Sequence, residues 1–149
     1  MKRLNTIIVG GGQAGLATSY HLAKLGIEHI VLEKAKQAGH AWRNERWDSF
    51  TLLTPNWSLR LPGAEYQGKD PDGFLSREEM VAYLEGYVKK INAPLQFDVQ
   101  VDLVESLGEG NPPVVRTSQG EFEAQNIVVA TGMFQSPKIP TYAQTISSA

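Results

Sequence analysis

Two short apolar runs in residues 4–33 enclose a glycine-rich turn and a helix-like segment, and this order leaves few folds open. The first run, residues 4–9, is too short and too rich in β-branched side chains for a helix. Between it and the second run, residues 29–32, the pattern predicts a helix over residues 13–25 that Gly26 closes. A strand, a helix and a second strand in this order indicate a parallel sheet of the Rossmann type.

The glycine turn has the spacing G-x-G-x-x-G, with glycines at positions 10, 12 and 15. Gly10 is expected to make the tight turn, Gly12 to let a pyrophosphate approach the backbone, and Gly15 to pack the helix on the sheet. Glu33 ends the second run, where its carboxylate is placed for a ribose 2′-hydroxyl and would repel a 2′-phosphate. The site therefore favours NAD or FAD over NADP. An ordinary glycine turn is the alternative, which the complete order of elements makes improbable.

Length and composition set the class of protein. The chain has 149 residues, enough for one domain, with 42% hydrophobic and 20% charged residues. A net charge of −2 gives no basic surface for nucleic acid or an anionic membrane, and no apolar stretch has transmembrane length. The chain has no cysteine, which excludes disulfides and thiolate metal sites, and no His/Asp/Glu cluster has metal-ligand spacing. We expect a cytoplasmic protein whose first residues form a strand and not a signal peptide.

The rest of the chain continues this pattern. A short strand is expected over residues 50–53, a surface loop over residues 62–73, and a helix opened by the capping box of Ser76 and Glu79. That helix carries an apolar stripe over residues 80–91, which we interpret as a packing face. Further strands are expected over residues 95–97, then in a three-stranded antiparallel meander over 99–107, 114–118 and 121–124, and finally over the apolar residues 127–130. The predicted fold is α/β, a Rossmann-type FAD/NAD(P)-binding domain with helices, a parallel sheet and an antiparallel β-meander crossover.

Four segments together resemble the single-component, class B flavin-dependent monooxygenases, the group of FMO, YUCCA and Baeyer–Villiger enzymes. They are GGGQAG at residues 10–15, GHAWRNERWDSFTLLTP at 39–55, DGFLSREEMVAYLEGYV at 72–88 and NIVVATGMFQSPKIP at 126–140. The last is the most specific, because many FAD proteins share the first. One departure is His40, which stands where the family usually has a second glycine.

The resemblance implies a set of FAD-binding residues. The pyrophosphate would be held by Gly10, Gly12, Gln13, Ala14 and Gly15. Glu33 would bind the adenosine ribose with Lys34 beside it, and Val101 would offer its backbone to the adenine. On the flavin side, the cofactor would contact Ala41 and Trp42, with Thr54 near the isoalloxazine ring. The chain would pass beneath the cofactor, near an interdomain hinge, at Ala130, Thr131 and Gly132.

Other conspicuous residues have simpler interpretations. The three tryptophans, at positions 42, 47 and 57, are candidates for core aromatics, and only Trp42 is favoured as a neighbour of the cofactor. His40 reads as a loop histidine, and His21 and His29 read as structural. We assign no catalytic role to Arg43 or Arg46, and no Ser-His-Asp set is expected.

The resemblance also implies an activity. In this family NADPH reduces FAD, O₂ forms a C4a-(hydro)peroxyflavin, and a small organic substrate is oxygenated. The family's second G-x-G-x-x-G, for NADPH, has no counterpart in these 149 residues. We therefore expect residues 1–140 to be the N-terminal, FAD-binding part of a monooxygenase that is inactive alone, with 141–149 a disordered or truncated tail and the NADPH domain absent. The alternatives are a non-catalytic FAD-binding or structural fragment and, less favoured, a two-dinucleotide-domain flavin reductase.

Overall fold

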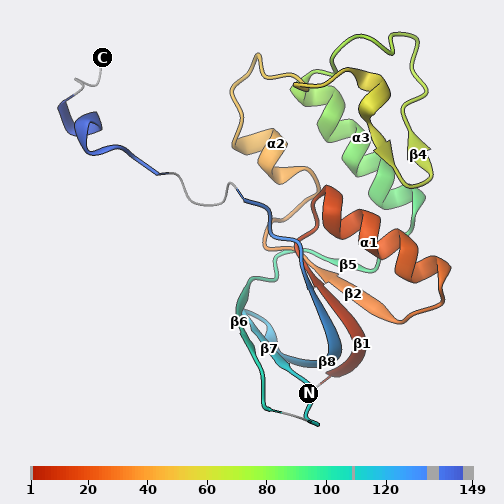
Figure 1. Cartoon of the computed structure of the whole chain (residues 1–149), viewed down its shortest axis with the longest axis vertical. Helices are drawn as coiled ribbons and strands as arrows, with labels where there is room; N and C mark the ends of the chain where they lie inside the picture. Colours follow the sequence, from red (N-terminus) through yellow and green to blue (C-terminus); the bar gives the residue numbers. More distant parts are fainter. Residues whose placement is uncertain (1, 109, 134–137, 146–149) are drawn as a thin grey trace.

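The computed structural model describes residues 2–108, 110–133 and 138–145 (Figure 1). In chain order the elements are β1 (Lys2–Val9), α1 (Gln13–Lys24), β2 (His29–Leu32), α2 (His40–Asn44), η1 (Asn56–Ser58), β3 (Arg60–Leu61), β4 (Ala64–Glu65), α3 (Arg77–Lys90), β5 (Leu95–Gln96), β6 (Val101–Glu105), β7 (Val114–Thr117), β8 (Gly120–Val129) and η2 (Thr141–Thr145). In Figure 1, α2, α3 and the β3–β4 hairpin lie above the carboxyl ends of the long parallel strands. The antiparallel strands β6 and β7 lie at the lower left, at the edge of the sheet beyond β8.

A six-stranded mixed sheet in the order β5-β2-β1-β8-β7-β6 forms the centre of the structure. Strands β5, β2, β1 and β8 are parallel, and β8, β7 and β6 are antiparallel. The chain leaves β1 toward β2 on one side and later returns as β8 on the other, so the direction of winding reverses at β1. This arrangement confirms the predicted α/β fold of Rossmann type with an antiparallel meander.

Strand β8 differs from the prediction. The sequence was expected to form two strands, residues 121–124 in the meander and 127–130 in the parallel sheet, whereas one continuous strand serves both. It pairs with β7 on one side and along β1 on the other. The polar residues Gln125 and Asn126, which lie between the two predicted strands, are exposed, and their side-chain amides hydrogen-bond to Asn5 of β1.

Two hydrophobic cores flank the parallel strands. In the first, Ile7 and Val9 of β1 pack with Ile30 of β2 and with Val115 of the antiparallel part. The second gathers Leu16 of α1 with α3 and the hairpin, through Leu59, Leu61, Met80, Leu84 and Tyr87. Ile7 and Val9 lie on the same face of β1, because successive side chains of a strand point to opposite faces.

Helix α3 begins and packs as its sequence predicts. The Ser76 hydroxyl accepts the backbone N–H of Glu79, and the Glu79 carboxylate accepts the backbone N–H of Ser76, which completes a capping box. The stripe residues Met80, Val81, Leu84 and Tyr87 are buried.

The segment between β2 and α3 is where local prediction was least accurate. The strand expected over residues 50–53 is wrong: the only bridge there joins Thr51 to Ser76. The loop expected over residues 62–73 contains β4 and the turn of its hairpin. Trp47 and Trp57 are 65% and 53% exposed, so their interpretation as core aromatics is also wrong.

The end of the chain stays partly a prediction. Residues 134–137, which include Pro137 of the family-like segment, and residues 146–149 lie outside the described residues. Within the tail expected to be disordered, η2 covers Thr141–Thr145. Among the residues that the structure describes, no helix is both long and apolar enough to cross a bilayer.

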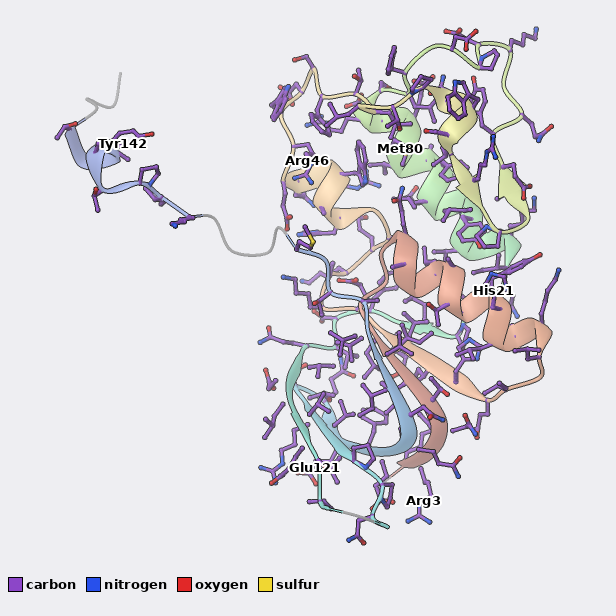
Figure 2. All side chains as sticks on the ribbon, in the orientation of Figure 1. Arg3, His21, Arg46, Met80, Glu121 and Tyr142 are labelled. Atoms are coloured by element: carbon purple, nitrogen blue, oxygen red, sulfur yellow. The ribbon has the colours of Figure 1, made fainter. Side chains whose placement is uncertain are left out.

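Charged pairs on the sheet lie far from its carboxyl edge. Figure 2 shows Arg3 and Glu121 at the lower end of the molecule, and Arg46 near the upper end. Arg3 pairs with Glu123 at 2.8 Å, and Arg116 pairs with Glu121 at 3.2 Å, on exposed faces of the sheet. Exposed pairs of this kind contribute at most about 1 kcal/mol each, so they do not determine the fold.

Tyr87 is a buried phenol in the second core. Its ring is 2% exposed, and its hydroxyl donates a 3.0 Å hydrogen bond to the carbonyl of Pro62. Burial raises the pKa of Tyr87 to about 12, with smaller contributions from Tyr83, Tyr20 and Glu65. The folded chain therefore holds the phenol proton more tightly than the unfolded chain does, for which the pKa of tyrosine is about 10.

From this we predict a loss of stability at alkaline pH that depends on Tyr87. The contribution is fully present below about pH 10 and is lost as the pH rises through about 12, to a limit of roughly 3 kcal/mol. Tyr87→Phe should cost about 1 kcal/mol at pH 8, because the hydrogen bond to Pro62 is removed. Urea unfolding at pH 8, 10 and 11.5 should then show the wild type losing stability faster than Tyr87→Phe. Parallel pH profiles would contradict the prediction.

Candidate functional site

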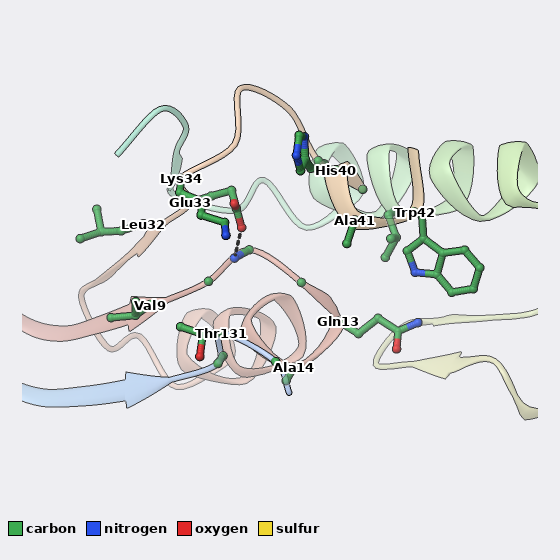
Figure 3. Close-up of a pocket in the computed structure, with 18 of the residues that line it drawn as sticks. Val9, Gln13, Ala14, Leu32, Glu33, Lys34, His40, Ala41, Trp42 and Thr131 are labelled. Atoms are coloured by element: carbon green, nitrogen blue, oxygen red, sulfur yellow. Dashed lines mark hydrogen bonds between the residues drawn. The ribbon is translucent and has the colours of Figure 1, made fainter. Parts of the chain in front are cut away.

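A cleft of about 950 Å³ opens at the carboxyl ends of the parallel strands. It lies where β1, β2 and β8 end, at Val9, Leu32 and Val129, and where α1 begins (Figure 3). In sheets of this kind, ligands bind at the carboxyl edge where the direction of winding reverses. The volume lies at the upper end of the range of about 300–1,000 Å³ typical of small-molecule sites.

The glycine turn between β1 and α1 is packed too closely for side chains at two of its positions. Gly10 has a φ of +106°, and a Cβ there would lie 2.5 Å from the carbonyl oxygen of Ala130. A Cβ on Gly15 would lie 1.9 Å from the carbonyl oxygen of Gly10. These contacts confirm the expected tight turn at Gly10 and the close packing of α1 at Gly15.

Gly12 differs from both. A Cβ on Gly12 would meet no atom within 4 Å, and its φ of −79° suits any residue. Gly12 lines the cleft, so the space that a side chain would take belongs to the cleft. At Gly12 the absence of a side chain leaves open space in the cleft, and the backbone conformation does not require glycine.

The N-terminus of α1 is uncapped. Gly12 offers no side-chain cap, and the first turn contains no acidic residue. Helix α3, by contrast, has a complete capping box and two acids, Glu78 and Glu79, in its first turn. Because the first amides of a helix have no partners within the helix, the start of α1 leaves N–H donors and the positive end of the helix dipole at the cleft.

The Glu33 carboxylate is fixed by two backbone amides. Its Oε2 accepts the N–H of Gly11 at 2.7 Å, drawn as a dashed line in Figure 3, and its Oε1 accepts the N–H of Ala35 at 2.8 Å. An ionised carboxylate has about four lone-pair sites, so each oxygen retains a site for a further donor. The carboxylate can therefore accept two further hydrogen bonds, one at each oxygen.

The fold brings most of the predicted site residues to this one cleft. Those that line it are Gly10, Gly12, Gln13, Ala14, Glu33, Lys34, Ala41, Trp42, Val101, Ala130, Thr131 and Gly132. Two do not line it. Gly15 lies behind the turn, and Thr54 lies elsewhere, where its hydroxyl oxygen accepts a 2.8 Å hydrogen bond from Ser58.

The wall opposite the glycine turn comes from α2, a helix that the sequence did not reveal. Trp42 lines the cleft and also packs against the second core. Arg43 pairs with Glu85 of α3 and so ties α2 to the longer helix. Five residues without a side-chain cap do not form a stable helix alone, so α2 depends on α3.

Several residues of the cleft were not predicted. The polar ones are Gln37, His40, Glu45, Arg46 and Gln100. His40 was expected to be a loop histidine, but it is the first residue of α2. The signal that could have identified it is the i, i+4 spacing of His40 and Asn44, which brings two side chains together only on a helix.

A Ser–His pair lies away from the cleft. Ser19 of α1 and the Nε2 of His29 are 2.8 Å apart, and the other ring nitrogen of His29 is 2.8 Å from the carbonyl oxygen of Ile27. Ser19 is only 1% exposed, so no substrate reaches its hydroxyl. The pair joins α1 to β2, in agreement with the structural interpretation of His29.

Comparison with protein families identifies one that spans most of the chain. Residues 7–146 match the family described as pyridine nucleotide-disulphide oxidoreductase. The match begins in β1 and includes every predicted site residue.

Individual relatives agree with this match. The chain is 36% identical to the uncharacterized oxidoreductase CzcO of Bacillus subtilis over 96% of its own length and 40% of the relative's. It superposes on the flavin-containing monooxygenase from Stenotrophomonas maltophilia with a TM-score of 0.81 and 29% identity, over 94% of this chain and 42% of that one. The bacillithiol disulfide reductase Bdr from Bacillus cereus gives a TM-score of 0.82 and 26% identity, over 94% and 43%. The chain thus spans about 40% of the length of these proteins.

Proposed function

Because the chain belongs to the pyridine nucleotide-disulphide oxidoreductase family, we propose that it is the FAD-binding N-terminal portion of an NADPH- and O₂-dependent flavin monooxygenase. One observation carries the proposal: the open start of α1, the free space at Gly12 and the fixed Glu33 carboxylate all meet in a single cleft. The flavin-containing monooxygenase similar to this chain, together with the four family-like segments, favours a monooxygenase over other flavoenzymes.

The glycine turn suits a diphosphate. Its charge requires N–H donors, which the first turn of α1 offers, and it requires close approach to the backbone, which the missing side chain of Gly12 allows. No acidic residue in that turn opposes an anion. Gln13 and Ala14 line the same part of the cleft, so their backbone amides would donate to the phosphate oxygens. Residues 12–14 would together form the diphosphate cradle.

Glu33 suits an adenosine ribose with both hydroxyl groups free. Each carboxylate oxygen can accept one hydroxyl in addition to its backbone amide. A 2′-phosphate at the same place would meet a carboxylate, and the two negative charges would repel. The cleft is therefore proposed for FAD, and NADPH for a second site in the longer protein.

The remaining residues of the cleft would orient the two ends of FAD. Val101, at the start of β6, would face the adenine. Ala41 and Trp42 would border the flavin side, with Thr131 and Gly132 beneath. Bound FAD would supply the redox chemistry, and these residues supply binding, orientation and exclusion of water. A small organic molecule would be the substrate of the longer protein.

The proposal is tested by adding one methyl group to the cradle. Gly12→Ala should weaken FAD binding at least tenfold, because the new Cβ takes the space of the diphosphate, while the free energy of unfolding changes by no more than about 0.5 kcal/mol. Flavin fluorescence quenching measures the dissociation constant, and urea unfolding measures stability.

The matched control is Gly86→Ala on α3. A Cβ at Gly86 also meets no atom within 4 Å, but Gly86 does not line the cleft. This variant should bind FAD as the wild type does. A wild-type chain that does not bind FAD, or a Gly12→Ala variant that binds it with unchanged affinity, would overturn the proposal.

A further inference from the structure

His40 lies on the α2 wall of the cleft, across from the glycine turn (Figure 3). Its side chain is partly exposed, and it stands one residue before Ala41 on the same wall. His40 can therefore contact a ligand held in the cleft, and the ring nitrogen that carries the proton decides which hydrogen bond it offers.

Asn44 determines the tautomer of the neutral His40 ring. The Nδ2 of Asn44 lies 2.9 Å from Nδ1 of His40 and 3.3 Å from the carbonyl oxygen of His40. Because a carbonyl oxygen can only accept, the amide nitrogen of Asn44 is correctly placed as the donor to both. Nδ1 therefore accepts a hydrogen bond, and the neutral ring carries its proton on Nε2, which is left as a donor.

The charged side chains around the cleft provide no net positive charge for an anionic ligand. Among the described residues that line it, the charged ones are Glu33, Lys34, Glu45 and Arg46, whose formal charges sum to zero. The guanidinium of Arg46 packs over the Phe50 ring, 5.4 Å from its centroid, and donates to the carbonyl of Glu45. Because these formal charges cancel, a diphosphate in the cleft would also rely on N–H donors, such as those at the start of α1.

We propose that His40 is a further binding residue for the diphosphate of the cofactor, with its Nε2–H donating to a phosphate oxygen. This inference rests on the proposed FAD site and adds a side-chain donor, on the wall formed by α2, to the backbone amides of α1.

The test compares three ligands on two His40 variants. His40→Leu keeps a side chain of similar bulk without a donor, and His40→Gln keeps an N–H donor at similar reach. FAD affinity is measured by fluorescence quenching, and ADP and adenosine by competition against FAD. His40→Leu should weaken FAD and ADP by about tenfold, the effect of one hydrogen bond to a charged group, and should change adenosine affinity by less than about twofold. His40→Gln should stay within about threefold of the wild type for all three.

The control is the same substitution at another histidine. His21→Leu changes an exposed residue of α1 that does not line the cleft, so it should leave all three affinities unchanged. Circular dichroism and urea unfolding check that each variant is folded. If the wild type binds FAD and His40→Leu binds ADP equally well, the inference fails while the proposed function stands. Equal weakening of ADP and adenosine would also overturn it, because adenosine has no phosphate. A wild type without FAD binding removes the proposed function itself.

Discussion

Gly15→Ala should lower the free energy of unfolding by more than about 3 kcal/mol and should abolish FAD binding at the same time. The added Cβ would lie 1.9 Å from the carbonyl oxygen of Gly10, where real contacts are almost never below 3.0 Å. Gly10 cannot move away, because its N–H donates to the carbonyl of Leu32 at 2.8 Å and the carbonyl of Ala130 occupies the space beside it. The start of α1 would have to shift by about 1 Å, and the cradle of the diphosphate would shift with it.

Two other glycines make this prediction quantitative. Gly26 has a φ of +66° but no neighbours around a Cβ, so Gly26→Ala should cost only the strain of a left-handed residue, about 1 kcal/mol. Gly12→Ala has neither strain nor a clash and should cost only the weaker N-cap preference of alanine, about 0.5 kcal/mol. Urea unfolding at 25 °C should therefore rank the losses as Gly15 first, Gly26 second and Gly12 last. A loss below about 1 kcal/mol at Gly15 would mean that α1 is free to slide on the sheet.

The features that the sequence predicted well are those set by residues close together in the chain. The capping box of Ser76 and Glu79 forms as its spacing predicts, because both partners lie in the same helical turn. The glycine spacing likewise predicted the turn after β1, since only glycine tolerates the backbone of Gly10 and the contact at Gly15.

The errors arose where distant residues decide the structure. Two strands were predicted on either side of Gln125 and Asn126, but Asn5 of β1 supplies partners for both amides and β8 continues through them. Within its own five residues, the short helix α2 is indicated only by the i, i+4 spacing of His40 and Asn44, because the helix is held through Arg43 and Glu85 of α3. Since His40 was predicted to lie in a loop, its place on the wall of the cleft was not predicted.

The site shows the same division. Glu33 was expected at the ribose because it ends the second apolar run of the strand–helix–strand pattern. Its hydrogen bond to Gly11 joins residues 22 positions apart, and its second bond, to Ala35, completes a clamp that no local pattern indicates. Thr54 was included by resemblance alone, and it is the predicted residue that lies apart from the cleft and its turn.

Glu33→Gln should lose at least a hundredfold in FAD affinity and about 2 kcal/mol in stability. A carboxylate accepts both backbone amides, whereas an amide side chain has one acceptor and one donor. One of the two N–H groups, that of Gly11 or that of Ala35, would then face a donor and lose its partner. The ribose would lose an acceptor at the same time, so binding and stability should fall together.

The comparison with Glu28→Gln separates this effect from a general change of charge. Glu28 is an exposed acid just before β2, so the same substitution there should leave both FAD affinity and stability nearly unchanged. Thermal unfolding with and without FAD measures both quantities, because a ligand that binds only the folded state raises the midpoint by an amount that grows with the logarithm of its affinity. The wild type and Glu28→Gln should gain several degrees with excess FAD, and Glu33→Gln should gain almost none. An equal gain for Glu33→Gln would show that the carboxylate only braces the turn, and that the ribose is held by other groups.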